Sequence, residues 1–487
     1  MLDVVKAPET THPEVVGPDS VGTPGGARAN QVVALVLAII GLRIGMGSLY
    51  DNSFLTHLAT GRLILDDGVI PRSDPYSFTA FGDPWTVQSW GASVIFAGIE
   101  QMAGLGGIRV LVGLLSAATA VLAWKLTSAA EGLVGRLLIA VPVLAIGAGL
   151  WVERPLIFSL VLLLGVLFAI EGRLDARMMV PVFLIWVNLH GSFVLGLAAI
   201  AAYGVGRALD RDRPTRELRV FVFAAAGTFL GGLLSPLGPK LLVFPLQLLQ
   251  RREAFVAVAE WKPPTWQQPV EIAFALQLVI ALGLVLLRYR RWRSIVPIVC
   301  FAAISLQSTR NIVHASLVML PAMAIAAQGL GTIDGRRPVR ILRPVVMALW
   351  ALLAVTAAIS LRLPDTDFSD YPVASAAWMR SEGLLDTDDR VVSRDFVGNY
   401  LEFRYGPDEV RVFIDDRVDM YPTDLIADYG ALLDEGTDFA AILERADATA
   451  VLWDRDSAFG DWLEDPGNGW EIVHDEDQWM VAVPADA

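Results

Sequence analysis

The sequence predicts an α-helical multi-span membrane protein of about eleven spans, followed by a small C-terminal α/β soluble domain. Of its 487 residues, 54% are hydrophobic and 18% are charged, and the mean hydropathy is +0.51. Apolar windows near the roughly 20 residues that cross a bilayer recur between residues 32 and 361, and none follows. We therefore expect a disordered cytoplasmic lead over 1–30, a transmembrane domain over 31–361 and an acidic domain over 362–487.

Charge separates the last domain from the rest of the chain. Residues 362–487 contain 9 Arg, no Lys and 31 Asp or Glu, a net charge of −22, whereas the remainder carries +8. A basic membrane part joined to an acidic tail argues against nucleic-acid binding and indicates that the tail lies in a different compartment. Cys300 is the only cysteine in this sequence, so an intrachain disulfide is excluded.

Short basic loops predict the orientation, because Lys and Arg near span ends prefer the cytoplasm. Five such loops are all cytoplasmic if every stretch between them crosses the membrane an even number of times. These loops are 125–136, 173–177, 207–216, 288–293 and 336–343. Interruptions such as "WVERP", "NLHG" and "QSTRN" divide the apolar stretches into pairs of spans. The result is a multi-pass protein of the cell membrane with a cytoplasmic N-terminus and an extracytoplasmic C-terminal domain.

The segment 90–105, "WGASVIFAGIEQMAGL", decides how many times the chain is expected to cross the membrane. It is short for a span and includes Glu100 and Gln101. A full crossing here would put every basic loop outside. We therefore expect a half-inserted helix within a first external loop that covers 51–106.

This topology gathers unusual ionisable side chains near the exoplasmic surface. Such groups are costly at membrane depth unless they are paired or hydrated, so their grouping on one face predicts a site. The candidates are Asp51, His57, Glu153, Arg154, His190, Glu260, Arg310 and His314, and Asp74 in the first external loop is a further one.

Several candidates also have a purely structural interpretation. Asp51 could cap a helix running from about 54 to 66. Asp74, which precedes a proline, is typical of an Asx turn, although it could also shape an acceptor site. Glu153 and Arg154 could form a local ion pair. His190 interrupts an apolar stretch, and it either lines a cavity or bonds a freed carbonyl.

Arg310 and His314 in "RNIVH" are the strongest candidates for binding an anion. Their i, i+4 spacing places both on one helical face. A guanidinium fork beside an imidazole suits a phosphate or pyrophosphate. Motifs typical of P-loop NTPases, zincins and serine esterases are missing from the sequence.

The sequence resembles the bacterial membrane proteins grouped with GT-C glycosyltransferases. The resemblance rests on "DNSFLTHLATGRLILDDGVIPRSDPYSFTAFGDPWTVQSW", followed by "ERP", "WVNLHGSF", "SPLG", "EW" and "RNIVH". The later "VGNYLEFRYGPDEVRVFIDDRVDMY" is similar to the extracytoplasmic tail of many of those proteins. Together these motifs extend the resemblance over most of the chain from about residue 31 to residue 484.

The resemblance implies a GT-C-like fold and a polyprenyl-phosphate-linked sugar as donor. It also implies a catalytic acid at the start of the first external loop, here Asp51, and a second acid in the next external loop, here Glu153. The sequence has Asn52 where some members carry another acid and lacks an Asp-x-Asp there. A divalent metal is therefore left open, and no cofactor is assigned.

The chemistry of the candidates agrees with glycosyl transfer. A carboxylate such as Asp51 can act as base on an acceptor hydroxyl, with His57 as a positioning group. Arg154, Arg310 and His314 can stabilise the departing lipid phosphate. We expect an inverting transferase of a hexosyl or pentosyl group that acts on an envelope glycan, lipid or protein. The alternatives are a transporter or flippase-like carrier of anionic solutes, and a non-catalytic envelope scaffold.

The acidic tail alternates between helical and strand-like segments, which predicts an α/β domain. Residues 372–385 and 424–446 favour helices, and "RVVS", "VRVFID", "ATAVLW" and "WMVAVP" favour strands. One apolar run ends in Asp415, Asp416 and Arg417, which would form either a ligand site or a solvated turn with an Asp416–Arg417 contact. We expect this domain to recognise or dock an acceptor.

Cysteines introduced at Ser381 and Arg211 test the orientation. A membrane-impermeant thiol reagent applied to intact cells should label position 381 from outside, whereas position 211 should react only after the cytoplasmic side is opened. The reverse pattern would show that 90–105 crosses the membrane as a full span.

Overall fold

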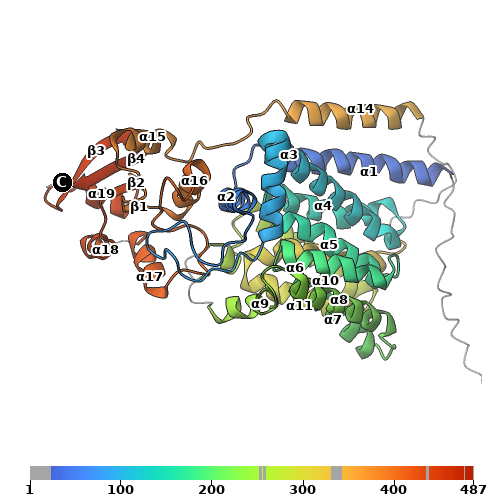
Figure 1. Ribbon diagram of the computed structural model, residues 1–487. Coiled ribbons are helices and arrows are strands. Elements are labelled where there is room, and N and C mark those ends of the chain that lie inside the picture. The colour runs from blue at the N-terminus through green and yellow to red at the C-terminus, as the bar shows by residue number, and fades with distance from the viewer. Residues whose placement is uncertain are drawn as a thin grey trace, which may run out of the picture.

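The computed structural model describes residues 24–251, 255, 259–330, 343–434, 438–476 and 478–485. They form a helical bundle and a C-terminal lobe, residues 372–485, which lies beyond one end of the bundle (Figure 1). The bundle contains α1 (Pro24–Gly45), α2 (Asn52–Asp67), α3 (Trp90–Leu126), α4 (Leu133–Leu150), α5 (Leu156–Ile170), α6 (Met179–Leu189), α7 (Phe193–Leu209), α8 (Thr215–Leu234), α9 (Lys240–Gln250), α10 (Pro269–Arg288), α11 (Trp292–Gln307), α12 (Ile312–Val318), α13 (Leu320–Ala326) and α14 (Arg343–Ser360).

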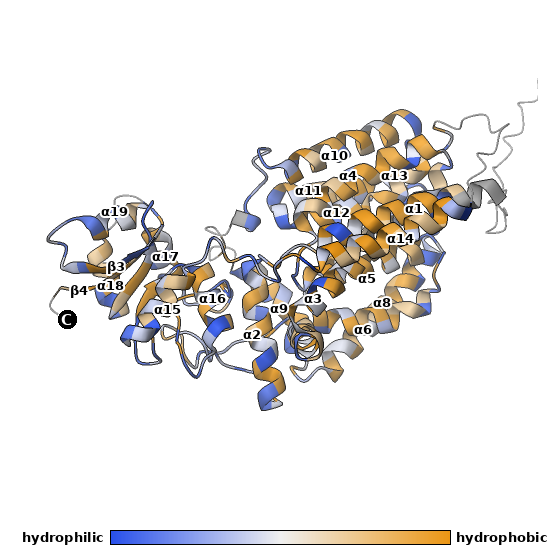
Figure 2. Cartoon of the chain, turned by 90° about the horizontal axis from the view of Figure 1, so that it is seen from above, coloured by the Kyte–Doolittle hydropathy of each residue, from blue (hydrophilic) through white to orange (hydrophobic). Residues whose placement is uncertain are grey.

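The bundle has the composition of a membrane domain. Within the described residues, five helices are long and apolar enough to cross a membrane, namely α3, α4, α8, α10 and α14. The bent pair α12 and α13 makes a sixth if it counts as one span. Five further apolar helices have 10–17 residues, so the count of about eleven stays a prediction. Figure 2 shows that hydrophobic residues predominate on the bundle helices, whereas the lobe is mixed.

The chain enters α1 earlier than the sequence predicts. Residues 24–30, expected at the end of a disordered lead, form its first turns, and Pro24 stands at the first helical position, where its missing amide hydrogen costs no hydrogen bond. Residues 1–23 lie outside the described part of the chain.

Helix α3 covers the segment that we expect to be half-inserted, 90–105, and the apolar segment that follows it. The helix begins at Trp90, and Gly104 interrupts it with φ 66° and ψ −172°. Glycine adopts this backbone conformation without steric cost. Figure 1 shows the first part of α3 running across the end of the bundle rather than along it. How deeply this part enters a membrane stays a prediction.

Helix α2 links the bundle to the lobe, because it packs against α3 on one side and α16 on the other. Gly61 permits the close approach to α3, since a Cβ atom there would collide with the backbone carbonyl of Ser93. The start of α2 is therefore held between the two parts of the molecule.

The lobe contains a four-stranded mixed sheet of order β1-β2-β4-β3, in which only β1 and β2 are parallel. Its elements are α15 (Val373–Glu382), β1 (Val391–Ser393), α16 (Asp395–Tyr405), α17 (Thr423–Leu432), α18 (Phe439–Ala446), β2 (Ala450–Asp454), α19 (Ala458–Glu464), β3 (Trp470–Glu476) and β4 (Trp479–Pro484). The strands β1, β2 and β4 confirm three of the four predicted strands.

The fourth predicted strand, "VRVFID", is wrong. Val412 forms only an isolated bridge with Ser77, in the loop between α2 and α3. Its amide donates to the Tyr76 carbonyl at 3.0 Å, and its carbonyl accepts from the Phe78 amide at 3.0 Å. The apolar run thus pairs with the bundle's loop instead of the lobe's own sheet, a choice that strand propensity cannot reveal.

Arg417 joins the lobe to the same loop. Its guanidinium lies 2.7 Å from Asp74 Oδ1, and Nε donates to Asp415 Oδ1 at 2.9 Å. It also lies 4.8 Å and 4.4 Å from the ring centroids of Tyr76 and Trp85. The expected Asp416–Arg417 contact is wrong, because this guanidinium already neutralises two buried carboxylates.

Replacing Arg417 tests how much this joint stabilises the molecule. Arg417→Gln should lower the free energy of unfolding by about 3–5 kcal/mol, because it leaves buried carboxylates without a countercharge. Denaturant unfolding in detergent, followed by tryptophan fluorescence, measures the change.

Arg445→Gln is the matched control. Arg445 forms an exposed pair with Asp428, and such pairs contribute little to stability. Equal effects of the two substitutions would contradict a special role for Arg417.

Candidate functional site

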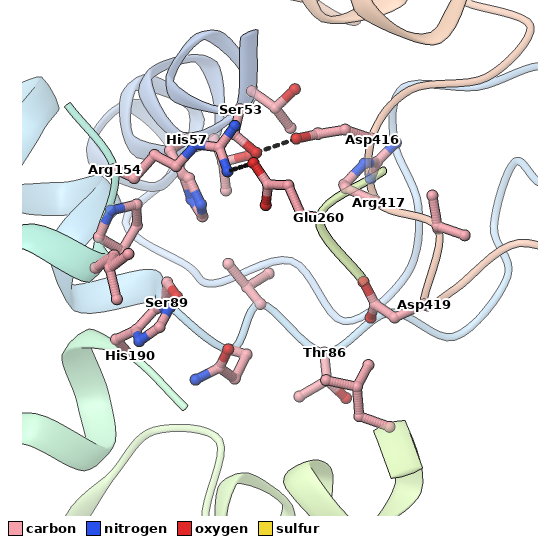
Figure 3. A pocket seen from close by; sticks show the side chains of 18 of the residues that line it. Ser53, His57, Thr86, Ser89, Arg154, His190, Glu260, Asp416, Arg417 and Asp419 are labelled. Atoms are coloured by element: carbon pink, nitrogen blue, oxygen red, sulfur yellow. Dashed lines mark hydrogen bonds and ion pairs between the residues drawn. The ribbon is translucent and has the colours of Figure 1, made fainter. Parts of the chain in front are cut away.

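A pocket of about 380 Å³ lies where the bundle meets the lobe (Figure 3). Its bundle side is formed by the start of α2, the segment before α3, the α4–α5 turn, the α6–α7 turn and residues near α9, Trp261 and Arg310. Its lobe side consists of Asp395 and residues 416–419. Two parts of the chain that are far apart in sequence therefore build one site.

Asp51 precedes α2 but does not cap it. Its backbone is extended, and its side chain makes no capping hydrogen bond. Instead, Oδ2 accepts from Nε of Arg154 at 2.6 Å, while Oδ1 is buried without a hydrogen-bond partner. Asp51 is only 8% exposed and does not line the pocket. Burial raises the pKa of its carboxyl, and the Arg154 charge opposes this rise.

Glu153 holds the same stretch of backbone in place. Its Oε1 accepts from the amides of Tyr50 at 2.5 Å and Asp51 at 2.7 Å. It is buried and does not line the pocket, so its contacts position the backbone before α2, and its catalytic role stays a prediction. The expected local pair with Arg154 is wrong, because the two side chains bind different partners.

Arg154 faces the pocket between two carboxylates. Besides Asp51, it binds Glu260, which also lines the pocket. Burial opposes its charge, but the two carboxylates outweigh this effect and raise the pKa of the guanidinium above its ordinary value. Arg154 therefore keeps its positive charge, and its two carboxylate partners fix the orientation of its guanidinium group.

Two predicted histidines also line the pocket. His57 Nδ1 lies 3.1 Å from Ser93 Oγ, and His190 Nδ1 lies 2.8 Å from Ser192 Oγ, in the break between α6 and α7. Burial, reinforced by the Arg154 charge, lowers the pKa of His57 to about 4. His57 is thus neutral near pH 7 and acts through hydrogen bonds rather than charge.

Arg310 and His314 lie in successive parts of one helical segment, Thr309–Val318. Arg310 lies in a short 3-10 turn, Thr309–Asn311, whereas His314 lies in α12, which starts after that turn. Arg310 lines the pocket with its guanidinium 4.7 Å from the Trp261 ring centroid, and it has no carboxylate partner among the described residues. His314 is 3% exposed and lies outside the pocket lining, so its expected contact with substrate is not supported.

Asp74 likewise lies outside the pocket. Its oxygens accept from the amides of Tyr76 and Ser77, each at 3.1 Å, and from the Ser77 hydroxyl at 2.5 Å. Together with the ion pair to Arg417, these contacts confirm the Asx-turn interpretation and leave no oxygen for a substrate. The contacts of Asp74 thus give it a structural role at the joint between loop and lobe.

Asp416 was not among the expected catalytic residues. Ser53 donates its hydroxyl to Asp416 Oδ2, and the Asp416 amide donates to Asn399 Oδ1 at 3.1 Å. The same Asn399 oxygen accepts from Thr56 of α2 at 2.8 Å. Burial and the neighbouring Asp415 raise the pKa of Asp416 to about 7.

The sequence marks this carboxylate only as the end of an apolar run. Its neighbour Asp419 also lines the pocket, and burial raises the pKa of its carboxyl to about 6. No spacing rule connects these residues to α2, more than 350 positions earlier. No group of three or more His, Cys, Asp or Glu within the described residues is placed to hold a metal ion.

Sequence comparison gives no relative for this chain, since no family model and no curated protein matches it. Its structure, however, is similar to the apo crystal structure of an oligosaccharyltransferase from Archaeoglobus fulgidus. The TM-score is 0.55 at 12% identity, over 88% of this chain and 69% of that chain. The oligosaccharyltransferase AglB from the same organism, in complex with an inhibitory peptide and a dolichol-phosphate, gives 0.51 at 12% identity over the same shares. The structural neighbours are thus archaeal oligosaccharyltransferases, and at 12% identity the similarity is one of fold, in agreement with the fold that the resemblance implies.

Proposed function

We propose that this chain is an integral membrane glycosyltransferase that moves a sugar from a polyprenyl-phosphate donor to a cell-envelope acceptor on the exoplasmic face, with inversion. The observation that carries the proposal is the pair of guanidinium groups, Arg154 and Arg310, in a pocket between the bundle and the lobe. The similarity in fold to oligosaccharyltransferases supports this reaction class.

The two arginines are suited to the donor phosphate. The negative charge on the phosphate grows as the glycosidic bond breaks, so fixed cations stabilise the transition state more than the ground state. Arg310 has no carboxylate partner among the described residues and is available for such a charge. Asp51 and Glu260 fix the direction of Arg154, which keeps its fork oriented before the donor binds. His57 and His190 add neutral hydrogen-bonding groups.

Apolar side chains on the same pocket suit the lipid part of the donor. Phe244 and Leu248 of α9, together with Phe255 and Leu156, line it beside the polar groups. A polyprenyl chain gains free energy from such contacts as its surface leaves water. The combination of cationic and apolar lining favours a lipid-linked phosphate over a free sugar nucleotide.

The acceptor would then lie against the lobe, which contributes the opposite side of the pocket. An envelope glycan, lipid or protein would present a hydroxyl or other nucleophile there. The AglB structure in complex with a peptide and a dolichol-phosphate is consistent with a site that takes a lipid-linked donor and an acceptor together.

Arg310→Gln tests the donor site. In liposomes with a panel of radiolabelled polyprenyl-phosphate sugars, the wild-type protein should form a labelled product. The variant should lose about 10²–10³-fold in kcat, because it lacks a charge that stabilises the departing phosphate.

Arg72→Gln serves as the matched control, because Arg72 is an exposed arginine of the first external loop that lies outside the pocket. It should keep wild-type turnover. Movement of a lipid-linked solute across the liposome without a covalent product would identify a transporter or flippase instead. Full turnover by Arg310→Gln would reject the proposed phosphate site.

A further inference from the structure

The pocket has two sides that come from different parts of the chain. The bundle contributes the guanidinium groups of Arg154 and Arg310, with Glu260 paired to Arg154, and the lobe contributes the carboxylates of Asp416 and Asp419. Arg417, also on the lobe side, is already paired with Asp74 and Asp415. Figure 3 shows Arg154 and His57 together on one side, with Asp416, Arg417 and Asp419 facing them from the other. An acceptor and a leaving phosphate could therefore contact different parts of the molecule.

Inverting transfer requires such a separation. The nucleophile reaches the anomeric carbon from the face opposite the leaving group, so the base that takes its proton belongs opposite the phosphate site. Asp51 does not meet this condition. Its Oδ2 is bonded to Arg154, the residue that would bind the phosphate, and its side chain does not line the pocket.

Asp416 meets the requirement that the base line the pocket away from the phosphate site. It lines the pocket from the lobe side, and its hydrogen-bonded side-chain partner among the described residues is the neutral hydroxyl of Ser53. The adjacent Asp415 is instead occupied by Arg417 and by the hydroxyl of Tyr421, at 2.5 Å. Of the two neighbouring carboxylates, one anchors the lobe and the other remains free to accept a proton.

The position of Asp416 is fixed from the bundle. Asn399 of α16 accepts from both the Asp416 amide and the Thr56 hydroxyl of α2, so a single side chain holds the two parts in register. A base must stay within hydrogen-bond reach of the proton that it removes, and these contacts provide that constraint.

We propose that the C-terminal lobe supplies the general base of the transfer reaction, and that this base is Asp416. The inference rests on the proposed function. The acceptor oxygen attacks the anomeric carbon, its proton moves to the Asp416 carboxylate, and the bond between that carbon and the phosphate oxygen breaks. The electron pair of the broken bond stays on the phosphate, which leaves as polyprenyl phosphate against Arg154 and Arg310.

The surroundings of Asp416 suit proton transfer near neutral pH. The charged groups that act on it are Arg154 from the bundle and Asp415 and Asp395 from the lobe, with burial as the largest influence. Burial, Asp415 and Asp395 raise its pKa to about 7 against the opposing effects of the Ser53 hydrogen bond and the Arg154 charge, so the carboxylate that accepts a proton predominates above that pH. kcat/KM should therefore rise with pH and level off above about 7.

Asp416→Asn tests the inference in the full-length protein in liposomes, with the radiolabelled polyprenyl-phosphate sugar that the wild type uses best. We expect kcat to fall by about 10²–10⁴-fold and the rise with pH to disappear. Binding of polyprenyl phosphate should stay within about twofold of wild type, since the cationic side is unchanged. Asp416→Glu, which restores a carboxylate, should recover part of the turnover.

Two further variants sharpen the result. Asp428→Asn removes an equivalent charge from α17 outside the pocket and should leave turnover unchanged. Asp51→Asn should lower kcat but keep the rise of activity with pH, because Asp51 orients Arg154 and does not take the proton.

Each remaining outcome overturns a specific claim. Full turnover by Asp416→Asn, or loss of turnover in Asp419→Asn alone, overturns the assignment of the base while the proposed function stands. Loss of polyprenyl-phosphate binding in Asp416→Asn indicates a structural role and overturns it as well. Lack of a labelled product from the wild type with every donor overturns the proposed function itself.

Discussion

The buried ion pairs of Arg417 are the constraint on which the site depends. This guanidinium neutralises Asp74 of the first external loop and Asp415 of the lobe, and Tyr76 and Trp85 enclose it. A charge group of this kind is unfavourable unless every partner stays in place, so it specifies one relative position of loop and lobe. The adjacent Asp416 reaches the pocket because this joint brings the lobe against α2.

A second set of charges prepares the bundle side of the pocket. Arg154 lies between Asp51 and Glu260, and Glu153 holds the backbone that carries Asp51. The acids that the sequence suggests as catalysts are largely used to orient one cation. Arg310 differs, because a tryptophan ring covers it and no carboxylate of the described chain neutralises it. Arg310 is thus the guanidinium on the bundle side of the pocket that has no ion-pair partner among the described residues, and the lobe side carries Asp416 and Asp419.

Sequence reasoning succeeded where the signal is local. It identified the membrane class, the break near residue 104, three strands of the lobe and five of the residues that line the pocket: His57, Arg154, His190, Glu260 and Arg310. It failed where one side chain had to be assigned to one of several distant partners. Asp74 was weighed as both a turn and a site residue, and only its contacts with Arg417 and Ser77 separate the two.

The sequence by itself determined that this chain has a long apolar helical part, an acidic tail and a set of ionisable groups gathered on one face, because hydropathy and charge are properties of each segment. The tertiary structure alone decided which of those groups meet. Asp416 lies hundreds of positions from Ser53, and its run of residues pairs with the first external loop instead of the lobe's sheet. No periodicity encodes such contacts, since they follow from packing between separate elements.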